Sequence, residues 1–336
     1  MADHPTDSSL PKPRVGLIGL GLMGRGMGLS LLRRGFTLGI VAHTRRETAQ
    51  ELLAAGAWEA ASPSALATGC DVLVLCLPSI DATRRVLFGD NGHNGRSTHS
   101  THSGNNRNND HSGHSGDSRY NCITQSGRHG LLVIECSTLT PQAARDYAAQ
   151  LAIHQIAFVD APVTRGPREA LDGTLNALMG GEPEAVERAA PVLQAFCEQV
   201  FRFGASGQGY AAKLISNFLA FSNLAAVAEG MATAGRAGID PAVLMQALAV
   251  SGAQSRVLDG LAPVIAGTGE SRSRVHIATA QKDVAYYAEF AEAMGTAGPV
   301  SATTAACYAQ AVAMGLGDEF TPGYLRHVAQ NLPSQA

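Results

Sequence analysis

The chain has 336 residues, of which 45% are hydrophobic and 16% charged, so it is long enough to bury the cores of two domains. Its net charge of −3 argues against nucleic acid or an anionic membrane as a partner. The six cysteines form no CxxC pair, which favours free thiols in a reducing compartment such as the cytoplasm. The polar N-terminus does not resemble a signal peptide, and the most apolar run, 218–228, is short for a membrane span. We therefore expect a soluble, cytoplasmic protein.

The first strand is predicted at 14–19, after 13 N-terminal residues that we expect to be flexible. A helical pattern follows at 25–34. Between them lies a G-x-G-x-x-G, here called the glycine turn: Gly19-Leu20-Gly21-Leu22-Met23-Gly24. Strand, turn and helix come in the order that dinucleotide binding requires, with Gly21 allowing the backbone to approach a pyrophosphate. The free N–H groups of the helix N-terminus would bind the phosphates, so all six residues are candidate cofactor contacts.

The end of the second strand, 37–42, bears on which cofactor is bound. An NAD site usually has an acidic residue there, which accepts from the ribose 2′-hydroxyl. This chain instead has His43-Thr44-Arg45-Arg46. The two arginines could bind a 2′-phosphate, or they could be surface residues at a helix start. The missing acid favours NADP, with NAD still possible.

Further strands and helices alternate up to residue 203. Helices are predicted at 47–55, 80–88, 142–154 and 183–197, and strands at 71–77, 131–135, 157–160, 174–179 and 199–203. Ligands of a parallel sheet bind at the carboxyl ends of its strands, so Leu77 and Pro78 should lie beside the cofactor.

Residues 91–129 differ from the rest of this half. Ser, Asn, Gly and His dominate, and the bulky apolar residues are Tyr120, Cys122 and Ile123. Such a composition cannot offset the entropy of ordering, so the segment is predicted to be a disordered insertion. Two His-x-x-His pairs lie in it without acidic or cysteine partners, and we predict no metal site.

The pattern after Gly207 is helical alone. A long helix without proline extends to about Arg236, and others are predicted at 240–250, 256–266, 278–294 and 300–314. The sequence therefore predicts an α/β protein with two domains. A doubly wound, Rossmann-type sheet domain at 14–206 would be joined by the long helix to an all-helical domain at 207–330.

Lys213 and Asn217 stand four residues apart near the start of the long helix, so they share one helix face. A lysine in apolar surroundings suits a proton donor or acceptor. The alternative is a lysine whose ammonium group extends to water.

Five stretches occur together in the order of one family: GLGLMG, ECSTLTP, DAPVTRG, GQGYAAKLISN and Gln281-Lys282-Asp283. The chain resembles the β-hydroxyacid dehydrogenases, the group of 3-hydroxyisobutyrate dehydrogenase and tartronate semialdehyde reductase. The resemblance implies that Lys213 is the catalytic acid–base and that Asn217 binds substrate beside it. It places cofactor contacts on the glycine turn, the 43–45 segment, Leu77, Pro78, Thr138 and Lys282. It also implies that the helical domain at 207–330 serves substrate binding and dimerisation, in a homodimer or homotetramer.

The resemblance further implies a substrate site at Ser137 and at Thr164, Arg165 and Gly166. The family usually has Ser-Gly-Gly at the last three positions, so Arg165 adds a cation where the substrate's acid group is expected. The implied reaction interconverts a short 3-hydroxy acid and its semialdehyde. The alternative is a sulfolactaldehyde or tartronate semialdehyde reductase, and with its arginine the loop resembles that of the sulfolactaldehyde branch. A catalytically inactive, nucleotide-binding scaffold is the alternative from another class.

Overall fold

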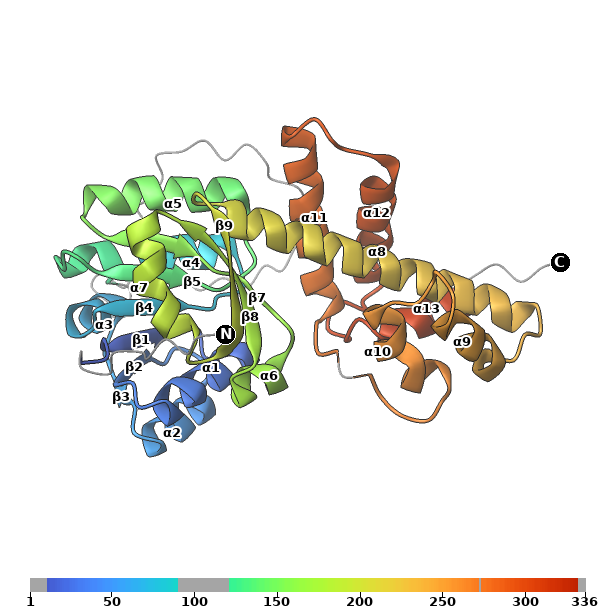
Figure 1. Cartoon of the computed structure of the whole chain (residues 1–336), viewed down its shortest axis with the longest axis horizontal. Coiled ribbons are helices and arrows are strands. Elements are labelled where there is room, and N and C mark those ends of the chain that lie inside the picture. The colour runs from blue at the N-terminus through green and yellow to red at the C-terminus, as the bar shows by residue number, and fades with distance from the viewer. Residues whose placement is uncertain (1–10, 90–120, 272, 332–336) are drawn as a thin grey trace, which may run out of the picture.

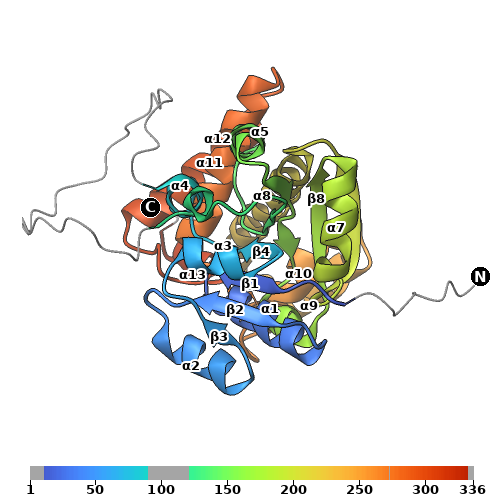
Figure 2. The ribbon, with the colours of Figure 1, turned by 90° about the vertical axis from the view of Figure 1, so that its left-hand side faces the viewer.

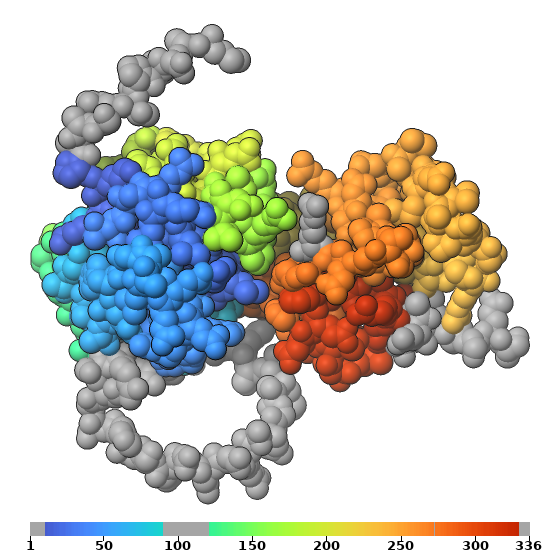
Figure 3. Space-filling model, turned by 90° about the horizontal axis from the view of Figure 1, so that it is seen from below, coloured from blue at the N-terminus to red at the C-terminus, as the bar shows by residue number. Residues whose placement is uncertain are grey.

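The computed structural model describes residues 11–89, 121–271 and 273–331, and the structural statements below concern these residues. It contains a sheet domain followed by a helical domain, and one long helix runs from the first into the second (Figure 1). Seen from below, the two domains form separate lobes (Figure 3).

The described part of the sheet has nine strands. They are β1 (Val15–Ile18), β2 (Leu38–Val41), β3 (Trp58–Glu59), β4 (Val72–Leu75), β5 (Leu132–Glu135), β6 (Ala157–Asp160), β7 (Val163–Thr164), β8 (Leu175–Gly181) and β9 (Cys197–Gly204). The order β3-β2-β1-β4-β5-β6 is parallel throughout and matches a dinucleotide-binding sheet. β8 then pairs antiparallel with β6 and β7, and parallel with β9. The doubly wound sheet predicted from the sequence is confirmed.

Helices cover both faces of this sheet (Figure 2). They are α1 (Leu22–Arg33), α2 (Arg46–Ala54), α3 (Pro63–Gly69), α4 (Ile80–Phe88), α5 (Pro141–Ile153), α6 (Pro167–Asp172) and α7 (Pro183–Leu193), with a 3-10 turn, η2 (Ile123–Ser126). Successive residues of a strand point to opposite faces. Accordingly, Val72 and Val74 pack with α1, α2 and α7, whereas Leu73 and Leu75 pack with α3 and α5.

The C-terminal part is helical, as predicted. It comprises α8 (Gln208–Arg236), α9 (Pro241–Ala249), α10 (Arg256–Ile265), α11 (Ile277–Ala293), α12 (Pro299–Ala313) and α13 (Gly323–Asn331). Its own core includes Phe221, Leu224, Val284 and Tyr308, and it is separate from the two cores of the sheet domain.

The first turn of α8 is fixed to the carboxyl edge of the sheet. The buried carboxylate of Asp160 accepts from Gly207 N at 2.8 Å and from Tyr210 N at 2.9 Å, so a strand end caps this helix. A Cβ at Gly209 would lie 2.3 Å from Leu178 O, which explains the glycine at this close approach. By length and composition α8 would also suit a membrane span, but many central helices of soluble proteins do too. Here it packs on β8, α11, α12 and α13.

The prediction that residues 91–129 form one disordered insertion is wrong for its last part; residues 91–120 lie outside the described residues. Cys122 and Ile123 are buried, and Asn121 O accepts from Ser64 N at 3.0 Å. These buried side chains and the bond to Ser64 attach the segment to the sheet domain near α3 and α4.

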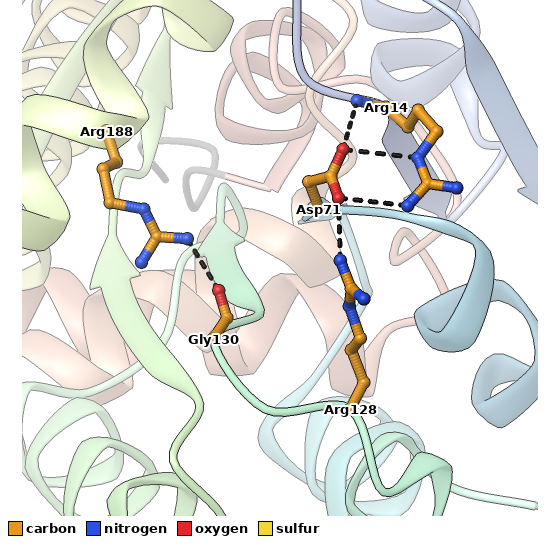
Figure 4. Close-up of polar contacts among 5 residues, drawn as sticks. All are labelled: Arg14, Asp71, Arg128, Gly130 and Arg188. Carbon is orange, nitrogen blue, oxygen red and sulfur yellow. Dashed lines mark hydrogen bonds and ion pairs between the residues drawn. The ribbon is translucent and has the colours of Figure 1, made fainter.

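Arginines hold the neighbouring backbone in place (Figure 4). Arg128 donates to Asp71 at 2.8 Å, and Asp71 also accepts from the guanidinium of Arg14. Arg188 donates to Gly130 O at 2.8 Å. These contacts fix the end of the segment just before β5 begins.

Candidate active site

Lys213 and Asn217 lie on one face of α8, as their spacing predicted, and both line a cavity between the two domains. Burial lowers the pKa of Lys213 below its ordinary value. The positive charge of Lys282 lowers this pKa further, whereas the negative charge of Asp283 opposes the shift. A lysine in this setting exchanges a proton nearer to neutral pH than a solvated lysine does.

Asp283 holds the side chain of Asn217. Asn217 Nδ2 donates to Asp283 Oδ2 at 2.7 Å, and Asp283 is buried. Lys282 Nζ lies 2.9 Å from Asp283 Oδ1 as an ion pair, without hydrogen-bond alignment, so Oδ1 has no hydrogen-bond partner among the described residues. Because one amide hydrogen is committed to Asp283, the orientation of the Asn217 amide is fixed.

Lys282 connects the helical domain to the sheet domain. Its Nζ donates to Thr138 O at 2.8 Å and lies 5.0 Å from the centre of the Tyr286 ring. The resemblance implied that Thr138 and Lys282 both contact the cofactor. The structure brings these two residues together, at the carboxyl edge of the sheet.

A buried network joins this edge to α8. Leu77 N donates to Ser137 Oγ at 2.6 Å, and Ser137 Oγ donates in turn to Glu135. The Tyr210 hydroxyl also donates to Glu135, one helix turn before Lys213. Burial raises the pKa of Glu135 to about 7, although bonds from Ser137 and Tyr210 oppose the shift. Ser137 is thus engaged in fixing Leu77 and Glu135.

The glycine turn fits a dinucleotide. A Cβ at Gly19 would lie 2.1 Å from Cys76 O, and one at Gly24 would lie 1.9 Å from Gly19 O. A Cβ at Gly21 would meet nothing within 4 Å, so open space lies over the first turn of α1. Backbone N–H groups are therefore accessible where a pyrophosphate is expected. Leu20 and Gly24 are buried, whereas Gly21 and Leu22 are exposed and Met23 is half-buried.

The two arginines after β2 have different surroundings. Arg46 forms an ion pair with Glu59, with Nη1 2.5 Å from Oε1. No hydrogen bond or ion pair of the Arg45 side chain occurs among the described residues, and His43, Thr44 and Arg45 are all exposed. Arg45 is therefore the better placed of the two to meet a 2′-phosphate.

The loop between β7 and α6 carries the predicted substrate residues. Thr164 and Arg165 line the cavity, while Gly166 N donates to the side chain of Glu169. Arg165 has a φ of +76°, a conformation that favours the glycine usual at this position. Its guanidinium donates to Glu198 Oε2 at 2.6 Å and to Thr174 O, so in this structure the charge is paired.

Three acidic residues of this region were missed as candidate site residues: Glu135, Asp160 and Asp283. The first two end apolar strand patterns, LLVIE and AFVD. A charged residue at the end of a buried strand is the signal that would have identified them. Asp283 lay within a recognised motif, but its bond to Asn217 spans 66 residues and has no local signal.

The sequence matches two family models over most of its length. Residues 14–102 and 112–204 match the NAD-binding domain of 6-phosphogluconate dehydrogenase. Residues 207–326 match the model described as the NAD-binding domain of NADP-dependent 3-hydroxyisobutyrate dehydrogenase.

Named relatives agree with these matches. The chain is 32% identical to the L-threonate dehydrogenase of Cupriavidus necator over 75% of its own length and 74% of the relative's. It is 29% identical to the 3-sulfolactaldehyde reductase of Escherichia coli, covering 94% and 95%. The solved 3-hydroxyisobutyrate dehydrogenase from Salmonella typhimurium has a TM-score of 0.76 at 27% identity, covering 94% of this chain and 100% of that one. The chain therefore belongs to the β-hydroxyacid dehydrogenase family and is an NAD(P)-dependent oxidoreductase that acts on hydroxyl groups.

Proposed function

We propose that the enzyme interconverts a 3-hydroxy acid and its semialdehyde, with Lys213 as the general acid–base and NADP(H) as the preferred cofactor. The observation that carries this proposal is Lys213 itself. It is a desolvated lysine on the wall of an interdomain cavity, beside an asparagine whose amide is held by a buried carboxylate.

The cofactor, when bound, supplies or accepts the hydride. In oxidation the neutral amine of Lys213 takes the proton of the substrate hydroxyl at Nζ. In reduction its ammonium form donates that proton to the carbonyl oxygen. Asn217 has an amide oxygen and a second N–H beyond the bond to Asp283, and these would orient the substrate oxygen. Lys282 and Ser137 hold the backbone of Thr138 and Leu77 at the carboxyl edge of the sheet, where the cofactor would bind.

The acid group of the substrate would bind at the loop after β7. Thr164 offers a hydroxyl, and Arg165 offers a cation if its guanidinium leaves Glu198. L-threonate and 3-sulfolactaldehyde are the substrates named for two relatives, and both carry an anionic group. The second candidate activity is therefore a reductase of sulfolactaldehyde or tartronate semialdehyde.

We further propose that the protein is a cytoplasmic homodimer or homotetramer. Large apolar side chains of the helical domain are exposed in the single chain, among them Leu219, Val243 and Val250. Apolar surface of this kind is typical of an interface between subunits. All six cysteines are free, which suits a reducing compartment.

The decisive assay measures turnover of a panel of 3-hydroxy acids and semialdehydes with NAD(H) and NADP(H). Lys213→Ala should lower kcat by about 10²–10⁴ for the substrate that wild type prefers, the usual size of an acid–base contribution. Cofactor affinity, measured by fluorescence titration, should be retained.

Lys12→Ala is the matched control. Lys12 is exposed, lies just before β1 and bonds to Arg34 O at the C-terminal end of α1. This variant should leave kcat unchanged. A Lys213→Ala enzyme within threefold of wild type would remove Lys213 from the mechanism. Cofactor binding without turnover of any member of the panel would favour the inactive scaffold.

A further inference from the structure

One face of α8 continues the cavity well beyond the catalytic pair. Six residues of this helix line the cavity, at spacings of three, four, seven, eight and eleven from the first: Lys213, Ser216, Asn217, Ala220, Phe221 and Leu224. At a rise of 1.5 Å per residue, this face is about 16 Å long. Its first half is polar and its second half is apolar, so the chemistry of the wall changes one turn after Asn217.

The apolar half of this α8 face is packed against neighbouring side chains and is little exposed. Phe221, Leu224 and Leu261 line the cavity yet are only 8%, 6% and 2% exposed, and the partly buried Val257 and Val275 line it as well. The lining also includes the hydroxyl residues Ser271, Ser273 and Thr321. The Tyr308 hydroxyl donates to Phe221 O at 3.1 Å, and the two rings pack edge to face. These contacts hold the wall in place.

Three of the charged lining residues are open to solvent. Arg256, Asp259 and Glu270 line the cavity, and all three are exposed. The remaining charged lining residues, Lys213 and Arg165, belong to the proposed reaction and acid-binding sites, so the buried lining that is left is uncharged.

The volume exceeds what a three- or four-carbon acid needs. The cavity holds about 680 Å³, within the range of roughly 300–1,000 Å³ that holds drug-sized ligands. None of the described residues predicted to bind the cofactor lines it, whether in the glycine turn or at Leu77, Pro78, Thr138 and Lys282. The predicted cofactor contacts therefore lie outside this cavity, and hydride transfer requires the nicotinamide to reach only its Lys213 end.

We propose that the apolar half of the cavity is a subsite for the body of the substrate. The preferred substrate is then a 3-hydroxy acid, or its semialdehyde, with an alkyl chain of several carbons. This inference rests on the proposed function: the reacting carbon lies at Lys213 and Asn217, and the chain extends along α8 towards Phe221 and Leu224.

A series of 3-hydroxypropionates tests the subsite while the reacting group stays the same. The group on C2 runs from hydrogen through methyl and ethyl to pentyl, and kcat/KM is measured with NADP⁺. Each added methylene should raise kcat/KM about fourfold until the chain fills the subsite, because burying one methylene contributes about 0.8 kcal/mol. If kcat/KM stays constant or falls as the alkyl group grows, the proposal is overturned. This is also the result expected if a second copy of the protein fills the cavity.

Two variants on neighbouring positions of α8 locate the effect. Ala220 lines the cavity, whereas Leu219 is 62% exposed and does not. Ala220→Phe should abolish the preference for the pentyl over the methyl compound, and Leu219→Phe should keep it. If both variants prefer the pentyl over the methyl compound to the same extent, the alkyl chain of the substrate binds somewhere other than beside Ala220. Thermal melting shows that each variant is folded.

A binding experiment separates failure of the subsite from failure of the proposed function. The same 2-alkyl propionates without the hydroxyl group are titrated into the full-length protein by calorimetry. Affinity that rises with chain length supports the subsite even if no hydroxy acid is turned over. If turnover depends on Lys213 but the affinity does not change with chain length, the proposed reaction stands and the proposed subsite is overturned.

Discussion

Tyr210 donates the hydrogen of its phenol to the buried carboxyl of Glu135, 75 residues earlier in the chain. Glu135 ends a strand of the sheet, and Tyr210 lies one helix turn before Lys213. The same carboxyl accepts from Ser137, which bonds to Leu77 N. One carboxyl group thus ties the helix that carries the candidate acid–base to the loops after β4 and β5, where cofactor contacts are predicted.

Replacing Glu135 should change how stability depends on pH. Burial raises the pKa of Glu135 from 4.5 to about 7. Between these values the native protein keeps a proton that the unfolded chain has lost, so stability is full below about pH 4.5 and falls as the pH rises towards 7. Glu135→Gln removes this titration and should flatten the decline in unfolding free energy from pH 5 to pH 8, by at most about 3 kcal/mol.

Denaturant unfolding at pH 5 and pH 8 measures the difference. Asp160, whose pKa burial raises to about 6, should keep part of the decline in the variant. Glu187→Gln is the control, because Glu187 is exposed and pairs with Arg202 at the surface. An unchanged decline in Glu135→Gln would mean that Glu135 stays ionised in the native protein.

Asp283 should tune the pH at which Lys213 works. Its negative charge raises the pKa of Lys213 against the effect of burial. Asp283→Asn removes this charge, so the rising limb of kcat/KM for oxidation should move to lower pH. The falling limb for reduction should move the same way, because the ammonium form is lost sooner.

Lys282→Gln should move both limbs in the opposite direction, because the charge of Lys282 lowers the pKa of Lys213. Full pH profiles of the two variants provide the comparison. Limbs that stay in place in both variants would show that a group other than Lys213 sets them.

Arg45 and Arg46 should differ in their effect on cofactor choice. Arg45→Ala is expected to raise the KM for NADPH about tenfold or more and to leave that for NADH nearly unchanged, because a charged hydrogen bond to the 2′-phosphate is lost. Arg46→Ala serves as the control, since Arg46 already pairs with Glu59. Equal losses with both cofactors would assign Arg45 no role in reading the phosphate.

Arg165 allows a backbone effect to be separated from a charge effect. Its φ of +76° strains any residue with a Cβ, so Arg165→Gly should be about 1 kcal/mol more stable than Arg165→Ala. Both variants lose the same guanidinium. If this group anchors the acid of the substrate, kcat/KM should fall alike in the two, and strongly.

Kinetics on an acid and on a neutral aldehyde of similar size, with thermal melts, test this pair. A loss shared by both substrates, or none at all, would leave Arg165 as a surface partner of Glu198. Glycine and alanine variants of equal stability would show that the strain is absorbed elsewhere in the loop.

The sequence predicted what depends on local spacing. The glycine turn, the Lys213–Asn217 face and the order of strands and helices follow from patterns among residues that are close together in the sequence. Helix ends were predicted within a few residues because caps are local too; Asp240, for example, caps α9 through Ala242 N at 2.8 Å.

What the sequence did not predict depends on partners far along the chain. The pairing of Asn217 with Asp283 and of Tyr210 with Glu135 exists only once the domains are folded. Short elements such as β3, α3 and α6 carry too few residues for a periodic signal. Cys122 and Ile123 looked like exceptions in a polar segment, but both are buried, and contacts with distant residues such as Ser64 and Asp71 hold the residues around them.

The helix that joins the domains also limits how they can move. α8 runs unbroken from Gln208 to Arg236, and its first turn is bonded to Asp160 of the sheet. No break in α8 lies between Lys213 and the later turns on which the other helices pack, so a hinge at this helix would have to bend a hydrogen-bonded segment.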